Sequence, residues 1–433
     1  MKLESFKLPG MLLTSHEFEI PLDHDRPDGE TITVFAREVV AIANAHREHM
    51  PWLIYFQGGP GFPSPRPTSK HGWLNRALND HRVLLLDQRG TGRSSPVTYQ
   101  TLARFDSPQK QADYLKNFRA DAIVKDAEFI RKTLLNPDQR WTGLGQSYGG
   151  FCLTHYLSAA PEGLEKVIIT GGLPPLTAHV DDIYRATYKR VLGKNKLYYD
   201  CFPMDAKQVG QIVSILRGAP VKLPSGGHLT PERFQQLGIV FGFEEGFETI
   251  HYMIDEAILK TKGTQGQLSY AFLRNVENAQ AYETNPIYAF LHEAIYCQNF
   301  ASNWSAQRVR SEFPQFSTDG VISQVLFTGE MIYPSMFNDY EYLKPLKETA
   351  EILAAYDQWP VLYDVEKLKR NTVPTVAAVY YDDMYVETSF SEETAKLIGN
   401  TRTWVTNEYE HSGIRYDGER ILDRLLRMLN GEL

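Results

Sequence analysis

The sequence has few cysteines, no long apolar run and no leader-like N-terminus. Its three cysteines, Cys152, Cys201 and Cys297, lie far apart in a chain of 433 residues, so they show no metal-ligand spacing and suit a reducing compartment. No run of about 18 apolar residues is present, which argues against a membrane-spanning helix. The N-terminal segment lacks the apolar core and the small-residue cleavage site of a signal peptide. We therefore expect a cytoplasmic protein.

The chain also lacks an excess of positive charge. It carries 45 basic and 53 acidic residues, which gives a net charge of −8 at pH 7. Because an acidic surface repels phosphate backbones and anionic lipids, neither nucleic acid nor a membrane is expected as a partner. Apolar residues make up 42% and charged residues 23% of the chain, as in ordinary globular proteins. The length allows more than one domain.

Short apolar runs alternate with a helical pattern in the first part of the chain. Alternating patterns at 18–20 and 31–37, with a turn-rich stretch between them, indicate an antiparallel hairpin. Further runs have the character of buried parallel strands, at 52–56, 83–86, 141–144 and 164–170. Residues 121–135 place their apolar side chains on one face of a crossover helix. This alternation predicts an α/β fold with a mainly parallel sheet.

The pattern changes after residues 171–175. From there to about residue 355 it is mostly helical, and strand signals return only at 376–381 and 403–406, before an amphipathic helix at 418–429. We therefore predict a discontinuous catalytic core, residues 1–175 and 356–433, with a helical cap domain inserted at 176–355.

The stretch GLGQSYGG, residues 143–150, contains the pattern G-x-S-x-G centred on Ser147. It follows a predicted strand and precedes a predicted helix, which is the context of a nucleophile elbow. Gly145 and Gly149 allow a tight turn without a side-chain collision, and the helix N-terminus offers free backbone N–H groups beside the hydroxyl. We predict that Ser147 is a nucleophile rather than an ordinary loop serine.

A serine nucleophile needs a base, and in such folds the chain order is Ser, acid, His. Only His411 of the twelve histidines lies beyond the last predicted strand, on a loop that can return to Ser147. The acid should end the preceding strand, where the sequence offers Asp382 and Asp383. One of these carboxylates would orient the imidazole and stabilise its charged form. The pattern alone leaves the choice between them open.

Acyl transfer also needs hydrogen-bond donors aimed at the developing oxyanion. One donor is expected from the backbone of Tyr148, the residue after the nucleophile. The other should come from the loop YFQGGPG that follows the run at 52–56. Pro60 has no N–H, so we assign this donor to Gly59, with Gly58 as the next choice.

Three stretches, together with the late Asp and His, resemble the proline iminopeptidases, which are prolyl aminopeptidases of the α/β-hydrolase superfamily. The stretches are QGGPG (57–61), DQRGTGRS (87–94) and GQSYGG (145–150). The resemblance implies a serine exopeptidase that releases N-terminal proline from small peptides without a metal or cofactor. The family's acid lies in a pattern V-P-T, strand, G-R-Y-D-M, which assigns the role to Asp383. The chain departs from the family where Gln57 replaces a His and where the Gly and Arg of that last pattern are replaced.

The family's cap supplies carboxylates that hold the free amino group of the substrate. A family motif resembling I-E-N-H-Y-F is echoed by LHEAIYC, which places a matching carboxylate at Glu293. Glu330, in FTGEMIYPSMF, is a second candidate, and we expect Tyr333 and Phe337 near it to wall a pocket for the pyrrolidine ring. Two buried carboxylates would bind one terminal ammonium strongly, because an unpaired buried charge is expensive.

Fold alone does not determine the acyl substrate. The main alternative is a serine esterase or amide hydrolase acting on another acyl group, which an apolar cap would favour, whereas carboxylates that face the nucleophile favour the peptidase. Epoxide hydrolases and dehalogenases carry Asp at the elbow, so Ser147 argues against them. A non-catalytic binding protein on the same scaffold should lack a member of the triad, and the sequence contains candidates for all three.

Overall fold

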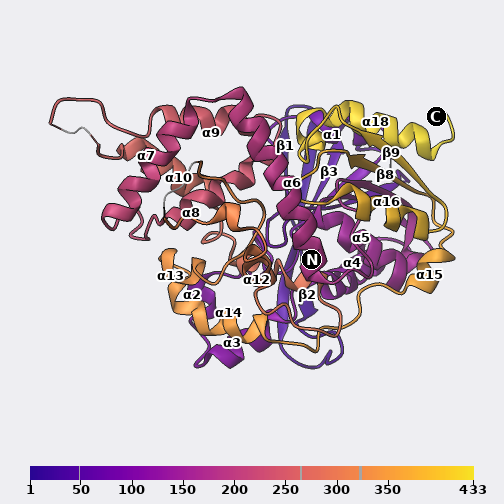
Figure 1. Ribbon diagram of the computed structural model, residues 1–433. Coiled ribbons are helices and arrows are strands. Elements are labelled where there is room, and N and C mark those ends of the chain that lie inside the picture. Colours follow the sequence, from indigo (N-terminus) through magenta and orange to yellow (C-terminus); the bar gives the residue numbers. More distant parts are fainter. Residues whose placement is uncertain (48, 264–265, 321–323) are drawn as a thin grey trace.

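The computed structural model describes residues 1–47, 49–263, 266–320 and 324–433. Within these ranges a nine-stranded sheet crosses the molecule in the order β1-β2-β3-β5-β4-β6-β7-β8-β9 (Figure 1). The strands are β1 (Lys2–Leu8), β2 (Met11–Pro21), β3 (Thr31–Ala41), β4 (Trp52–Phe56), β5 (Arg82–Leu86), β6 (Trp141–Gln146), β7 (Leu164–Thr170), β8 (Thr375–Tyr380) and β9 (Thr401–Thr406). The pairs β1–β2, β2–β3 and β3–β5 are antiparallel and all the others are parallel, which confirms the predicted α/β fold.

The central strand β4 consists of apolar and aromatic residues because both faces of the sheet are covered. In β4, Leu53 and Tyr55 belong to one buried cluster, while Ile54 and Phe56 belong to the other. Successive side chains of a strand point to opposite faces, so a strand between two helical layers has no polar side. The edge strand β1 is mostly exposed and shows no such pattern, which explains why the sequence analysis did not predict it.

Helices cover the two faces of the sheet in separate groups. One face carries α1 (Gly72–Ala77), α17 (Gly413–Tyr416) and α18 (Gly418–Leu429). The other carries α4 (Ala120–Leu134), α5 (Tyr148–Ala159), α15 (Val365–Lys369) and α16 (Thr388–Leu397). The predicted crossover helix at 121–135 and the terminal helix at 418–429 agree with α4 and α18 to within a residue.

Apart from α15, the helices between β7 and β8 extend from the sheet toward the left of Figure 1. They are α6 (Val180–Cys201), α7 (Asp205–Gly218), α8 (Pro231–Gln235), α9 (Gly246–Asp255), α10 (Tyr270–Ala279), α11 (Pro286–Leu291), α12 (Ser305–Arg310), α13 (Met336–Asp339) and α14 (Lys347–Ala354). The short helix α3 (Pro108–Leu115) lies beside α14, and the short helix α2 (Tyr99–Leu102) contributes Tyr99, whose ring stacks on that of Tyr342. None of the helices in the described ranges has the length and apolarity needed to cross a membrane.

Candidate active site

Ser147 occupies a sharp turn between β6 and α5. Its backbone has φ 54° and ψ −126°, a conformation that a residue with a Cβ rarely adopts. The neighbouring glycines make the turn possible. A Cβ on Gly149 would lie 2.0 Å from the carbonyl oxygen of Phe56, and one on Gly145 would lie 2.4 Å from the carbonyl oxygen of Gly149. The turn therefore has the geometry of a nucleophile elbow, with Ser147 at its tip.

His411 and Asp383 lie on the loops that follow β9 and β8. His411 Nδ1 is 2.6 Å from Asp383 Oδ2, and both side chains are buried. The other oxygen, Asp383 Oδ1, accepts hydrogen bonds from the amides of Tyr385 at 2.8 Å and Val386 at 3.0 Å. These two bonds hold the carboxylate in place and leave Oδ2 to orient the imidazole.

Asp382, the other candidate acid, points elsewhere. Its side chain is 50% exposed and its Oδ1 lies 3.3 Å from Arg190 Nη1. The two adjacent aspartates, in the turn after β8, thus have different partners. Of the two, Asp383 is the one that contacts His411.

Ser147 and His411 line the same cavity, which has a volume of about 250 Å³. Loops from the core and segments from the region between β7 and β8 enclose it. Its other lining residues are Gln57, Gly58, Gly59, Phe62, Gln146, Ile239, Val240, Phe243, Ala279, Ala281, Tyr282, Tyr288, Glu330, Tyr385 and Arg415. Most of this lining is apolar or aromatic, and Glu330 is the carboxylate in it.

The loop after β4 passes directly over the elbow. A Cβ on Gly58 would lie 3.0 Å from the Cβ of Ser147 and 2.7 Å from Gln146 Oε1, so only glycine fits there. Among the described residues, the amide of Gly59 donates no hydrogen bond. Tyr148 provides the first N–H of α5, which has no partner within the helix. Both amides predicted as oxyanion donors therefore lie on segments beside Ser147 and remain free.

Gln57 takes the place of the histidine that the resemblance leads one to expect. Its side-chain Oε1 accepts a hydrogen bond from the hydroxyl of Tyr55 at 2.8 Å. Its carbonyl oxygen accepts from Gln88 Nε2 at 3.0 Å. These two hydrogen bonds anchor the loop, so the replacement of the histidine by Gln57 does not disturb the backbone of the glycines that follow.

Glu330 enters the cavity from an irregular segment after α12. Its Oε1 accepts a hydrogen bond from the hydroxyl of Tyr288, and its Oε2 lies 3.2 Å from Nε2 of the buried His292. Burial disfavours the charged form of Glu330, but the nearby His292 and the Tyr288 hydroxyl outweigh it. They hold the pKa of this carboxyl below its usual value. The cavity thus contains a carboxylate that is charged at neutral pH.

Glu293 lies outside the lining of the cavity. Its two carboxylate oxygens accept hydrogen bonds from the amides of Ser305 at 3.1 Å and Ala306 at 2.9 Å, at the start of α12. Burial raises the pKa of Glu293. This position gives Glu293 the role of capping a helix terminus, and it offers no support for the prediction that Glu293 binds substrate.

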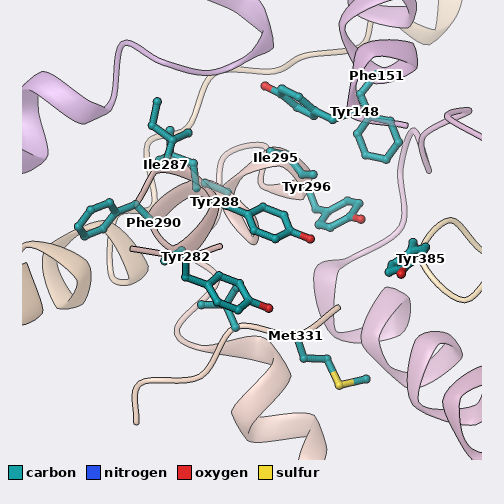
Figure 2. Close-up of a cluster of buried hydrophobic side chains, with 14 of the residues drawn as sticks. Tyr148, Phe151, Tyr282, Ile287, Tyr288, Phe290, Ile295, Tyr296, Met331 and Tyr385 are labelled. Carbon is teal, nitrogen blue, oxygen red and sulfur yellow. The ribbon is translucent and has the colours of Figure 1, made fainter. Parts of the chain in front are cut away.

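Aromatic side chains form the walls around Glu330, but they are not those expected. Tyr333 and Phe337 do not line the cavity, so that expectation is wrong; Tyr333 hydrogen-bonds to Tyr188 at 2.9 Å instead. Figure 2 shows Tyr282 and Tyr288 side by side with Tyr385 across from them. The rings of Tyr282 and Tyr288 stack 5.5 Å apart, and Tyr385 lies 4.6 Å from the ring of His411.

These three tyrosines remain neutral at physiological pH. Burial raises the pKa of Tyr282, Tyr288 and Tyr385 well above the ordinary value. The sequence analysis missed them, together with His292 and Arg415. Weak signals existed for Arg415, which stands four residues after His411, and for Tyr385, which stands two residues after Asp383; Tyr282, Tyr288 and His292 lie on one stretch far from Ser147 and His411 in the sequence. In the described part of the chain, no group of three or more His, Cys, Asp and Glu side chains is placed to hold a metal.

Comparisons with known proteins identify the family of the chain. The family of the alpha/beta hydrolase fold matches residues 51–211. The chain is 48% identical to a proline iminopeptidase of Aeromonas sobria, over 98% of both chains. It is 37% identical to proline iminopeptidase aneH of Aspergillus aculeatus, over 97% of this chain and 94% of the relative. A solved structure of a proline iminopeptidase from Mycobacterium smegmatis covers 96% of this chain and 98% of its own, at 12% identity and a TM-score of 0.46.

Proposed function

Since the chain belongs to the proline iminopeptidase family of α/β hydrolases, we propose that it is a serine exopeptidase that releases N-terminal proline from small peptides. The observation that carries this proposal is the presence of Glu330 in the cavity lined by Ser147 and His411. A carboxylate that faces the nucleophile suits a substrate with a free amino group. An acyl substrate without one would leave the Glu330 carboxylate with only the Tyr288 hydroxyl and His292 as partners, and would gain nothing from its charge.

The acylation step uses Ser147, His411 and Asp383. The Ser147 hydroxyl attacks the carbonyl carbon of the N-terminal prolyl residue while His411 takes the hydroxyl proton. Asp383 holds the imidazole and stabilises its charged form. The amides of Gly59 and Tyr148 donate hydrogen bonds to the oxyanion. As the peptide bond breaks, His411 gives its proton to the leaving amine, and an acyl-enzyme remains.

Deacylation reverses these roles with water as the nucleophile. His411 takes a proton from water, the resulting oxygen attacks the acyl carbon, and the proton returns to Ser147 as proline leaves. Every proton in this cycle passes through one imidazole. The scheme requires no metal or cofactor.

Glu330 accounts for the exopeptidase character of the proposal. The secondary ammonium of an N-terminal proline donates its hydrogens to the carboxylate, and the rings of Tyr282, Tyr288 and Tyr385 surround the pyrrolidine. An N-terminal extension would replace the ammonium by a neutral amide, which cannot form an ion pair with Glu330. The charge and the walls together select for a terminal residue.

The domain boundaries form part of the same proposal. Residues 1–175 and 356–433 make the catalytic core, which supplies the triad and the oxyanion donors, while residues 176–355 form the cap domain, which supplies Glu330.

The three cysteines are unpaired, which supports a reducing, cytoplasmic compartment.

The test compares three substrates with the wild type and Ser147→Ala. The substrates are proline β-naphthylamide, its N-acetylated form and a short-chain nitrophenyl ester. We expect rapid cleavage of the free-amine proline substrate alone, reduced by about 10⁴-fold or more in the variant. Ester cleavage without a preference for proline would overturn the proposal in favour of an esterase.

A further inference from the structure

The lining of the cavity carries side chains of both charge signs, Glu330 and Arg415. Glu330 comes from the region between β7 and β8, whereas Arg415 belongs to α17, behind the loop that carries His411. Arg415 is exposed at the edge of the cavity. Its Nη2 donates a hydrogen bond to Gln146 Oε1 at 3.1 Å. Across the described ranges no carboxylate pairs with this guanidinium.

This lack of a partner distinguishes Arg415 from the arginines around it. Arg420, on the next helix, pairs with Glu408 at 2.7 Å. Arg415 uses one of its five N–H donors on a neutral amide oxygen, and that oxygen belongs to the residue immediately before the nucleophile. The planar fork of donors suits a carboxylate, which it can bind through two parallel hydrogen bonds.

The position of Arg415 indicates which part of a peptide it would meet. His411 must deliver a proton to the leaving amine, so the leaving portion passes beside His411. Helix α17 begins two residues after His411 and carries Arg415 in its single turn. Glu330 already occupies the part of the lining that would receive the amino group. The guanidinium therefore lies on the side where a leaving peptide would end.

We propose that Arg415 binds the C-terminal carboxylate of a short substrate, so that the enzyme prefers prolyl dipeptides and tripeptides with a free carboxyl group. The inference rests on the proposed function, since it assigns the leaving side of the same reaction. The cavity then matches a zwitterion, with the ammonium at Glu330 and the carboxylate at Arg415. Longer peptides still react, but without this contact.

The experiment compares Pro-Gly, Pro-Gly amide and proline β-naphthylamide. The amide has the same shape as Pro-Gly without the negative charge, and the naphthylamide has no carboxylate. In the wild type we expect kcat/KM to be about tenfold higher for Pro-Gly than for its amide, as a charge-assisted hydrogen bond allows. Added salt should reduce this preference, because the contact lies at the solvent edge.

Three variants complete the test. Arg415→Gln should lower kcat/KM for Pro-Gly about tenfold and leave the other two substrates within about twofold. Arg415→Lys should retain part of the preference, because it keeps the charge but loses the fork. Arg420→Gln, a matched change of an exposed arginine outside the cavity, should leave all three substrates unchanged.

The outcomes separate this inference from the proposed function. If the wild type cleaves proline β-naphthylamide but shows no preference for Pro-Gly over its amide, the carboxylate site is refuted while the aminopeptidase stands. An equal loss on all three substrates in Arg415→Gln would also refute it, because Arg415 would then act on the elbow through Gln146. If the wild type cleaves none of the three, the proposed function falls and the inference falls with it.

Discussion

Substituting Glu330 by glutamine changes the charge of the cavity while preserving the shape of the side chain. The glutamine can still accept the hydrogen bond from Tyr288 through its remaining oxygen. Its amide group would face His292, which lies 3.2 Å from the present Oε2 and has Tyr184 on its other nitrogen at 3.3 Å. Because a neutral imidazole can accept from an amide, the variant should fold normally. A change in activity then reports on the charge.

The expected loss of activity in Glu330→Gln follows from the burial of the ion pair between Glu330 and the substrate ammonium. Glu330 is 13% exposed, so solvent screens its interaction with a bound ammonium only weakly. Removing one partner of a buried, hydrogen-bonded charge pair costs about 2–5 kcal/mol. We therefore expect kcat/KM for proline β-naphthylamide to fall about 30-fold to 5,000-fold. An ester without an amino group should react within a few-fold of the wild-type rate.

The pH dependence of this discrimination is a second readout of the same contact. The pKa of Glu330 lies below its ordinary value of 4.5, so the carboxylate keeps its charge throughout the neutral and mildly acidic range. A depressed folded-state pKa also stabilises the protein above the unfolded value, and this contribution is lost as pH falls through the folded pKa. The ratio of amine to ester activity should therefore stay constant from pH 8 to about pH 5. If Glu330→Gln lowered kcat/KM equally for the amine and ester substrates, or for neither of them, the amine-binding role of Glu330 would be refuted.

Three further substitutions test the remaining assignments. Asp383→Asn should lower kcat about 10⁴-fold, because it favours the wrong tautomer of the His411 imidazole. Asp382→Asn alters a half-exposed ion pair and should change kcat less than about twofold. Equal effects of the two variants on kcat would contradict the choice of Asp383 as the acid. Glu293→Gln should lower the free energy of unfolding in urea by about 1–3 kcal/mol, because glutamine offers one acceptor to two backbone amides. The Glu293→Gln variant should keep the wild-type preference for free-amine substrates. A loss of that preference would show that Glu293 binds the substrate.

The core of the fold could be predicted because its signals are local. Apolar runs such as 52–56 coincide with β4, and the glycines around Ser147 mark the elbow without any tertiary information. The chain order of the triad narrowed the base to His411. Between Asp382 and Asp383, the residues themselves gave no preference, since both follow the same strand within three residues. The hydrogen bond to His411 distinguishes them, and that contact depends on the packing of two loops.

The region between β7 and β8 was harder to predict because many of its helices are short and their ends are irregular. Adjacent residues on a helix point about 100° apart, so a shift of one position moves a side chain to another face. His292 and Glu293 illustrate this: His292 faces Glu330, while Glu293 turns to the start of α12. A short sequence motif such as LHEAIYC carries no information about that rotation. The motif match therefore pointed to Glu293, although it is the neighbouring His292 that contacts Glu330.

The position of Glu330 depends on long-range contacts that no local pattern contains. The irregular segment before it is held by Asn195 of α6, whose side chain accepts from the amide of Phe327 at 2.8 Å and donates to its carbonyl at 2.8 Å. The next residue, Thr328, donates its amide to the carbonyl of Gln235 at 2.8 Å. These bonds replace the partners that a strand would have, so the segment is ordered without regular structure. The carboxylate that we propose as the basis of exopeptidase specificity thus depends for its place on a buried amide more than 130 residues earlier in the chain.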